Sequence, residues 1–271
     1  MKAQYKALII DTVLKEIRSK TLIFIFLATT VSIFFVNMIL GTINSQMGGD
    51  QTISMAGVNI LSLNFRILNS INFIVAAIFG VSVFRSDFQN NIIYQYLSFP
   101  IARAEYFFLR VLGTWLLVMA YYTYSYLLSA ILFSFSFNQI IFTAGHLYSF
   151  LILSLYLLLV IFISIFFSLL MNKIGALFAT FASCLAAAAA YGSLSTQTYT
   201  EMFQDMSVFK ALGIALYYLF PRVSFLDKVS ANLLFSEAAT SINWWEQIIH
   251  LVIISGLYVW LANYLVKRKD F

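Results

Sequence analysis

Charge, cysteine, histidine and proline are all scarce in this chain, and the scarcity excludes whole classes of protein. Only 10% of the 271 residues are charged, against about 25% in soluble domains, so water is not the main solvent. The single cysteine, Cys184, excludes an intrachain disulfide framework or thiolate metal site, and we interpret it as a packing residue. The two histidines, His146 and His250, share no predicted helix face with a carboxylate pair, so the sequence indicates no catalytic or metal site.

Nucleotide-binding motifs are absent as well. No Gly-Lys dipeptide occurs, which excludes a Walker phosphate loop. The net charge of +5 comes from basic residues without the interleaved aromatic residues that stack on bases. We therefore expect no catalytic activity, no cofactor and no nucleic acid in this chain, and membrane lipids are the predicted partner of its basic residues.

Long apolar runs dominate the chain, since 62% of its residues are hydrophobic. A helix needs about 20 apolar residues to cross a hydrocarbon layer of about 30 Å. The first run is too long for a signal peptide, so we expect it to be retained. The sequence predicts an all-α integral membrane protein with one domain, residues 1–271, and six spans near residues 21–43, 65–84, 109–134, 147–171, 175–195 and 247–266.

Basic residues gather in every second gap between these runs. Twelve of the 16 Lys and Arg lie at the two ends of the chain, between the second and third runs, or between the fourth and fifth. The positive-inside rule then predicts that both termini are cytoplasmic. The opposite side keeps only Arg66, Lys210, Arg222 and Lys228.

Two segments outside the spans have helical patterns of their own. Residues 1–20 combine basic side chains with an imperfect apolar stripe, which is typical of an amphipathic helix in the membrane interface. The large external segment, residues 196–246, contains an apolar run from Phe209 to Phe220 that is too short to cross and is broken by Pro221. Ser224 and Asp227 form a capping pattern before a further helix that reaches Phe235.

The longest predicted cytoplasmic segment between spans covers residues 85–108. Asp87 and the pair Asn90-Asn91 can begin a short helix there, because their side chains accept hydrogen bonds from free backbone N–H groups. Pro100 ends that helix, because it lacks an N–H donor and disfavours helical geometry at the preceding residue.

Uncharged polar residues occur inside the second and third predicted spans. Hydrogen bonds between helices are one explanation for them. The alternative is a translocation surface for an amphipathic substrate, formed by Asn69, Asn72, Tyr121, Tyr122 and Tyr124.

The fifth predicted span carries small residues at a four-residue spacing. Small side chains on one stripe let helices approach closely, which matters in lipid because no hydrophobic effect drives the helices together. The stripe predicts a helix-packing face formed by Gly175, Ala179, Ser183 and Ala187.

The segment from Asp87 to Arg110 resembles the cytoplasmic signature of the type-2 ABC exporter permeases, in particular the NosY-like subgroup. Asp87 takes the acidic position of that signature, Leu97-Ser98-Phe99-Pro100 its Leu-Ser-x-Pro, Arg103 its basic position and Gly113 its later glycine. The N-terminal helix ending in Arg18-Ser19-Lys20, the break at Leu219-Phe220-Pro221 and the basic C-terminus are similar to that family too. Asn91 and Ile92 depart from it, since they replace the usual Gly-Thr.

The resemblance implies a function and a set of partners. It implies that the chain is a permease subunit of the bacterial cytoplasmic membrane, dimeric with a second copy or a paralogue, and that it exports a hydrophobic or amphipathic substrate. A separate cytoplasmic ABC ATPase would bind ATP and Mg and contact a coupling helix between the second and third spans. The implied coupling residues are Asp87, Asn90, Asn91, Ile92, Pro100 and Arg103. Force transmission to an extracytoplasmic partner, and a non-transporting scaffold or assembly factor, stay open as alternatives.

Overall fold

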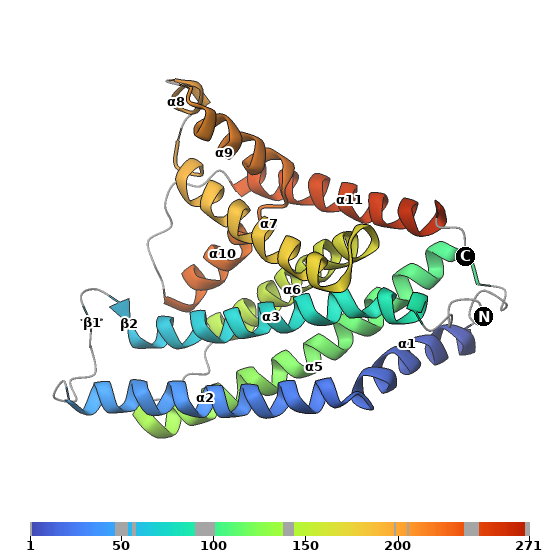
Figure 1. Ribbon diagram of the computed structural model, residues 1–271. Helices are drawn as coiled ribbons and strands as arrows, with labels where there is room; N and C mark the ends of the chain where they lie inside the picture. The colour runs from blue at the N-terminus through green and yellow to red at the C-terminus, as the bar shows by residue number, and fades with distance from the viewer. Residues whose placement is uncertain are drawn as a thin grey trace.

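Helices account for nearly all of the residues that the structure describes (Figure 1). The structure is a computed structural model that describes residues 2–46, 54–55, 58–89, 101–137, 144–197, 199–204, 206–235 and 244–268. Its helices are α1 Lys2–Ile17, α2 Lys20–Gln46, α3 Ile60–Gln89, α5 Arg103–Phe137, α6 Ala144–Leu170, α7 Lys173–Leu194, α8 Tyr199–Phe203, α9 Val208–Leu219, α10 Val223–Phe235 and α11 Trp244–Arg268. Two short antiparallel strands, β1 Ser54–Met55 and β2 Val58–Asn59, lie between α2 and α3. The all-α fold class is confirmed.

Among the described residues, six of these helices are long and apolar enough to cross a membrane, and they correspond to the six predicted spans. The spans are Lys20–Ile43, Leu61–Arg85, Arg103–Ser136, Ala144–Leu170, Lys173–Leu194 and Trp244–Arg268. The helix α3 continues to Gln89, beyond the predicted end at residue 84. The apolar run ends in the sequence at Arg85, and the additional turn also carries Asp87, whose charge is paired inside the folded protein.

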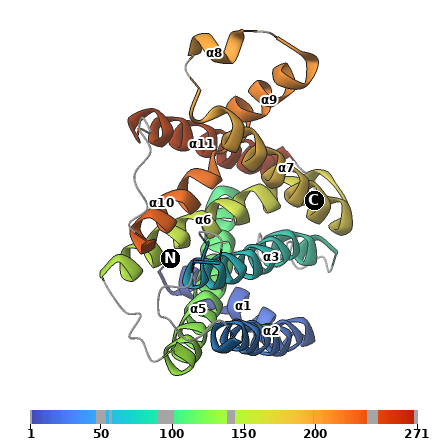
Figure 2. The same ribbon diagram turned by 90° about the vertical axis from the view of Figure 1, so that its left-hand side faces the viewer.

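The helices α2 and α11 lie at the edges of the bundle (Figures 1 and 2). In an apolar stretch of 18 residues within each helix, only 17% of the residues of α2 and 11% of those of α11 are buried, against 56% for α3. The outer surface of α2 is strongly apolar and includes Phe24 and Met38, which are 72% and 71% exposed. Such surfaces suit contact with lipid, which is as apolar as the side chains themselves.

The basic helix ends gather at one end of the bundle, where α1 begins and α11 finishes (Figure 1). Arg85 Nη1 at the end of α3 donates to Met171 O after α6, at 2.6 Å. Arg103 Nη1 at the start of α5 donates to Lys267 O near the end of α11, at 2.8 Å. We call this region the basic end: α1, the last turn of α3, the first two turns of α5, the α6–α7 turn and the last turn of α11.

The helices α3 and α6 approach each other closely at Gly80. A Cβ atom at this position would lie 2.7 Å from Ser164 Cβ and 3.2 Å from the Cα and O atoms of Ile161. Real Cβ contacts are longer than this, so any larger residue would push the two helices apart. Glycine therefore sets the α3–α6 distance.

The helices α9 and α10 form a bent pair with an angle of 76° at Pro221. Ser207 caps α9 by accepting a hydrogen bond from Lys210 N, and α9 matches the predicted apolar run. The predicted cap at Ser224 is wrong, because α10 already begins at Val223, directly after the Pro221 break. The pair together is long and apolar enough for a bent seventh span or a re-entrant loop.

The direction of α10 favours the re-entrant arrangement. The helix α9 runs inward from α8, and α10 then turns back toward the end of the bundle where α3 begins (Figure 1). The α10 part of the large segment between α7 and α11 packs inside the bundle, against α6 and α3. Ser149 of α6 and Ser230 of α10 share a buried 2.5 Å hydrogen bond, and Asn69 of α3 contacts Asp227 of α10.

The small-residue stripe of α7 is only partly the packing face. Ser183 and Ala187 are buried as predicted, but the buried residues of the first half are Ala176 and Thr180 rather than Gly175 and Ala179. Four residues rotate about 400° around an α-helix, which is about 40° more than one full turn. Residues at a strict four-residue spacing therefore drift off one helix face, whereas a mixture of three- and four-residue spacings stays on it. Gly175 instead donates its N–H to Asn172, the cap of α7. Cys184 is a free, buried thiol on the packing face, as predicted.

Candidate functional site

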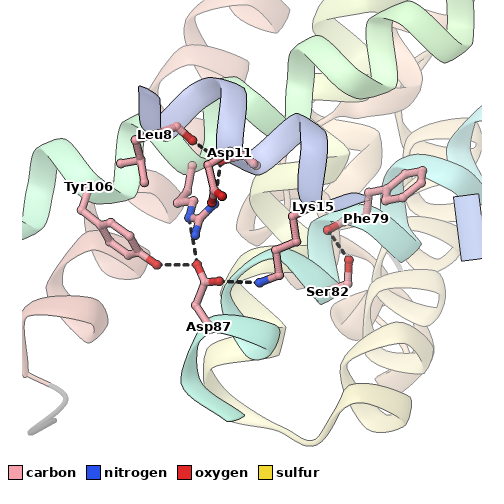
Figure 3. Close-up of polar contacts among 9 residues, drawn as sticks. Leu8, Asp11, Lys15, Phe79, Ser82, Asp87 and Tyr106 are labelled. Carbon is pink, nitrogen blue, oxygen red and sulfur yellow. Dashed lines mark hydrogen bonds and ion pairs between the residues drawn. The ribbon is translucent and has the colours of Figure 1, made fainter. Parts of the chain in front are cut away.

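The basic end contains a carboxylate that is completely buried. Asp87 in the last turn of α3 is 0% exposed, and three groups from other helices surround it (Figure 3). Its Oδ1 atom accepts a 2.6 Å hydrogen bond from Lys15 Nζ of α1. Its Oδ2 atom lies 2.8 Å from Arg110 Nε of α5 and accepts a 2.5 Å hydrogen bond from the Tyr106 hydroxyl.

The arginine of this cluster joins α5 to α1 as well. Arg110 is 1% exposed, and its Nη1 atom donates to Thr12 Oγ1 at 2.8 Å. The same atom lies 3.3 Å from Asp11 Oδ2. We call Asp11, Thr12, Lys15, Asp87, Tyr106 and Arg110 the ion cluster; its two acidic and two basic side chains balance in formal charge.

Helical spacing explains how two of the helices present these side chains. Asp11 and Lys15 are four residues apart on α1, and Tyr106 and Arg110 are four apart on α5, so each pair occupies one helix face. Gly113, one turn after Arg110, lets α1 approach: a Cβ atom there would lie 2.8 Å from Thr12 Cβ. The first turn of α5 is held by Glu105, whose Oε2 atom accepts the Ala102 N–H at 3.1 Å.

Two side chains near the cluster have perturbed acidities. Burial raises the pKa of Glu16 on α1, and the charges of Lys15 and Lys173 partly oppose that rise. The pKa of Tyr5 is raised chiefly by its hydrogen bond to Glu105 on α5. Both shifts place α1 in contact with the other helices of the basic end.

The chemistry of the ion cluster suits a mechanical role. Burying charges is unfavourable unless they are paired, and a buried ion pair often adds little net stability although breaking it is costly. Our hypothesis for this cluster is that it defines geometry. Within the described parts of the chain, no group of three or more His, Cys, Asp or Glu side chains could hold a metal ion. The cluster fixes α1, α3 and α5 relative to one another at the point where the connection between α3 and α5 begins and ends.

The predicted coupling residues have different positions in the structure. Asp87 is part of α3, so the prediction that it begins a separate short helix is wrong, and its carboxylate is enclosed by the ion cluster. Arg103 is the first residue of α5; it is exposed, and its Nη1 atom donates to Lys267 O. Asn90, Asn91, Ile92 and Pro100 lie outside the described residues.

The predicted translocation residues do not form one surface. Tyr121 contacts Thr29, and the Tyr124 hydroxyl lies 2.7 Å from Thr30 Oγ1, so both tyrosines bind α2. These contacts fit the alternative explanation, hydrogen bonds between helices.

The remaining three face a different part of the bundle. Asn69, Asn72 and Tyr122 line a narrow pocket, together with Leu153, Tyr156 and Leu157 of α6. Asn72 is 1% exposed, and its Oδ1 atom accepts a 3.1 Å hydrogen bond from Ser125. Helix rotation, which hydropathy does not report, separates these three residues from Tyr121 and Tyr124.

Sequence reasoning missed the pairing of the charges. In the sequence, Arg110 and Lys15 contribute only to the pattern of basic residues, and Asp11 has no predicted role. Opposite charges at the ends of three neighbouring segments are a signal that they pair, but only once the helix ends are known to adjoin.

No protein-family model matches this chain, and no curated protein matches it.

Lys15 offers a first test of the cluster. Replacing Lys15 with methionine is expected to loosen α1, because Asp87 loses its 2.6 Å partner while Arg110 remains. Lys15 is 26% exposed, so we expect a loss of about 1 kcal/mol in the free energy of unfolding. Thermal unfolding in detergent, with proteolysis at Arg18 as a report on α1, measures the effect.

Lys6→Met is the matched control, since Lys6 is an exposed lysine on the same helix. Equal behaviour of the two variants would show that the Lys15–Asp87 contact does not hold α1.

Proposed function

We propose that this chain is the membrane-spanning permease subunit of an ABC transporter in the bacterial cytoplasmic membrane. The observation that supports the proposal most is the ion cluster, which ties α1, α3 and α5 together beside residues 90–100. That connection is where the family resemblance implies a coupling helix. A segment that receives motion from an ATPase needs stiff attachment at both ends, because a loose attachment absorbs a rigid-body movement.

The attachments on both sides of the connection meet this requirement. On one side, Asp87 is bound by Lys15, Arg110 and Tyr106, and Arg85 reaches the end of α6. On the other side, Arg103 reaches the end of α11. Motion of the connection would therefore move all these helices together rather than one alone.

The proposal includes the other components of the transporter. A separate cytoplasmic ATPase binds ATP and Mg and supplies the energy, and two permease chains, either identical or paralogous, form the pathway. The cargo is a hydrophobic or amphipathic molecule, moved outward. The α9–α10 pair is the surface that could instead pass the motion to an extracytoplasmic partner.

Purification of the tagged chain from its host in mild detergent, followed by mass spectrometry, tests this function. A stoichiometric soluble protein with a Walker phosphate loop is the expected companion. Repeated recovery without any ATPase, at native expression and in more than one detergent, would contradict the proposal and favour the scaffold alternative.

Arg103→Glu provides the sharper test. The substitution reverses the charge at the exposed start of α5, so we expect the chain to insert normally while recovery of the ATPase falls at least about fivefold, because charge complementarity governs such interfaces. Quantitative mass spectrometry of the purified complex measures the ratio.

Lys20→Glu makes the same charge reversal at an exposed position at the start of α2 and serves as the control. A complex that forms equally well with Arg103→Glu, with unchanged substrate-stimulated ATP turnover, would remove Arg103 from the coupling contact.

A further inference from the structure

Asp227 is an acidic residue that the fold brings into the helix bundle. It lies on α10, and its Oδ1 atom accepts a 3.4 Å hydrogen bond from Asn69 Nδ2 of α3, 158 residues away in the sequence. It also interacts electrostatically with Tyr156 of α6. A carboxylate within a helix bundle of a membrane protein is unfavourable, and such groups are typically functional.

The narrow pocket introduced above adjoins this carboxylate. Asn69 and Tyr156, two of the residues that interact with Asp227, both line it. Tyr122, another lining residue, is 0% exposed, and its hydroxyl has no hydrogen-bond partner among the described residues. A buried hydroxyl without a partner is rare, because it loses its bonds to water without compensation.

The charge balance around Asp227 is incomplete. Within the described parts of the chain, no Lys, Arg or His nitrogen lies within 4.0 Å of its carboxylate. Arg66 lies close enough to influence Asp227 electrostatically but is itself exposed. An ionised carboxylate in this setting lacks a paired counter-charge.

We propose that Asp227, Asn69, Asn72, Tyr122 and Tyr156 form a recognition site for the cationic group of an amphipathic substrate. The proposal rests on the proposed transport function and names the class of cargo. The carboxylate supplies the counter-charge, and the faces of the two tyrosines stabilise a cation through their ring electrons. The amide oxygens accept hydrogen bonds, while Leu153 and Leu157 contact the apolar body of the ligand.

The present conformation is a closed form of this site. The pocket leaves no space for a water molecule, so a ligand enters only when the lining helices α3, α5 and α6 separate from one another. It reaches Asp227 only where α10 meets α3. The polar contact between these helices at the site is the long Asn69–Asp227 hydrogen bond, which is weak at 3.4 Å. A short break at Pro221 joins α10 to α9 at an angle of 76°.

Binding of two hydrophobic ions of equal size and opposite charge to the full chain in nanodiscs tests the proposal. The wild-type protein is expected to retain tetraphenylphosphonium at a saturable site and not tetraphenylborate, with protein-free nanodiscs as the blank. Asp227→Asn should weaken tetraphenylphosphonium binding at least about tenfold, since one buried charge partner is lost. Arg66→Gln should strengthen it, because a repelling charge is removed.

Glu201→Gln is the control, because it makes the same carboxylate-to-amide change at an exposed position on α8, outside the proposed site. Thermal unfolding of every variant identifies a loss of fold. No saturable binding of the cation to the wild-type chain, equal binding to folded Asp227→Asn, or a preference for tetraphenylborate would each overturn the cation site.

These outcomes are separable from those of the proposed function. Recovery of an ATPase with the chain, but no preference for the cation, would leave the ABC assignment standing and remove the cation site. Cation binding that depends on Asp227, without any ATPase partner, would keep the site and remove the ABC assignment.

Discussion

Replacing Arg110 with methionine is expected to reduce the free energy of unfolding by about 3–5 kcal/mol. The substitution leaves the carboxylate of Asp87, which is 0% exposed, without its 2.8 Å partner Nε. It also removes the donor that Thr12 and Asp11 of α1 share. Thermal unfolding in detergent measures the loss, and Arg18→Met, at an exposed arginine between α1 and α2, is the control.

The double variant Asp87→Leu/Arg110→Met separates lost pairing from lost packing. Apolar residues of similar volume often replace a buried ion pair with little loss of stability, so we expect the double variant to recover to within about 2 kcal/mol of the wild type. Lys15 is 26% exposed and can turn its ammonium group toward water. A double variant less stable than Arg110→Met would contradict the view that the loss of one partner of the buried Asp87 carboxylate causes the destabilisation.

Replacing Gly80 with leucine is expected to have the second large effect. Even the first added carbon would lie 2.7 Å from Ser164 Cβ and 3.2 Å from the backbone of Ile161, and backbone atoms cannot move away as a flexible side chain can. We expect a loss of about 3 kcal/mol or more, or failure to accumulate in the membrane. Expression level and thermal unfolding measure it.

Gly256→Leu is the matched control in a spanning helix. No atom lies within 4 Å of a Cβ atom built at Gly256 on α11, so this variant should remain within about 1 kcal/mol of the wild type. If both glycines tolerated leucine equally, the α3–α6 approach would not depend on Gly80.

The Arg110 and Gly80 substitutions test two different properties: the pairing of charges at the basic end and the closeness of helix packing in the core. Gly80 sets how closely α3 and α6 pack, and the ion cluster sets how α1 and α5 meet the last turn of α3. The pairs of the cluster require particular partners at particular distances, whereas apolar contacts tolerate sliding. If the double apolar variant is stable but no longer couples to an ATPase, the cluster serves defined geometry rather than stability.

The sequence alone accounts for the elements of the fold. Crossing a hydrocarbon layer needs about 20 apolar residues in one helix, which is a local requirement, so the six spans were predictable from residue type and run length. Pro221 likewise ends α9 through its own missing N–H group. The helix ends were less predictable, because α3 continues through Asp87 only when that charge finds partners on α1 and α5.

Only the tertiary structure decided which polar residues meet. Asp87 and Arg110 lie in different helices, Lys15 and Asp87 are 72 positions apart, and Asn69 and Asp227 are 158 apart. Whether such side chains meet depends on the rotation of each helix about its axis, which close packing sets at places such as Gly80 and Gly113. Hydropathy measures how apolar a segment is and contains no information about that rotation. For this reason the spans followed from the sequence, while the ion cluster and the position of Asp227 required the packed bundle.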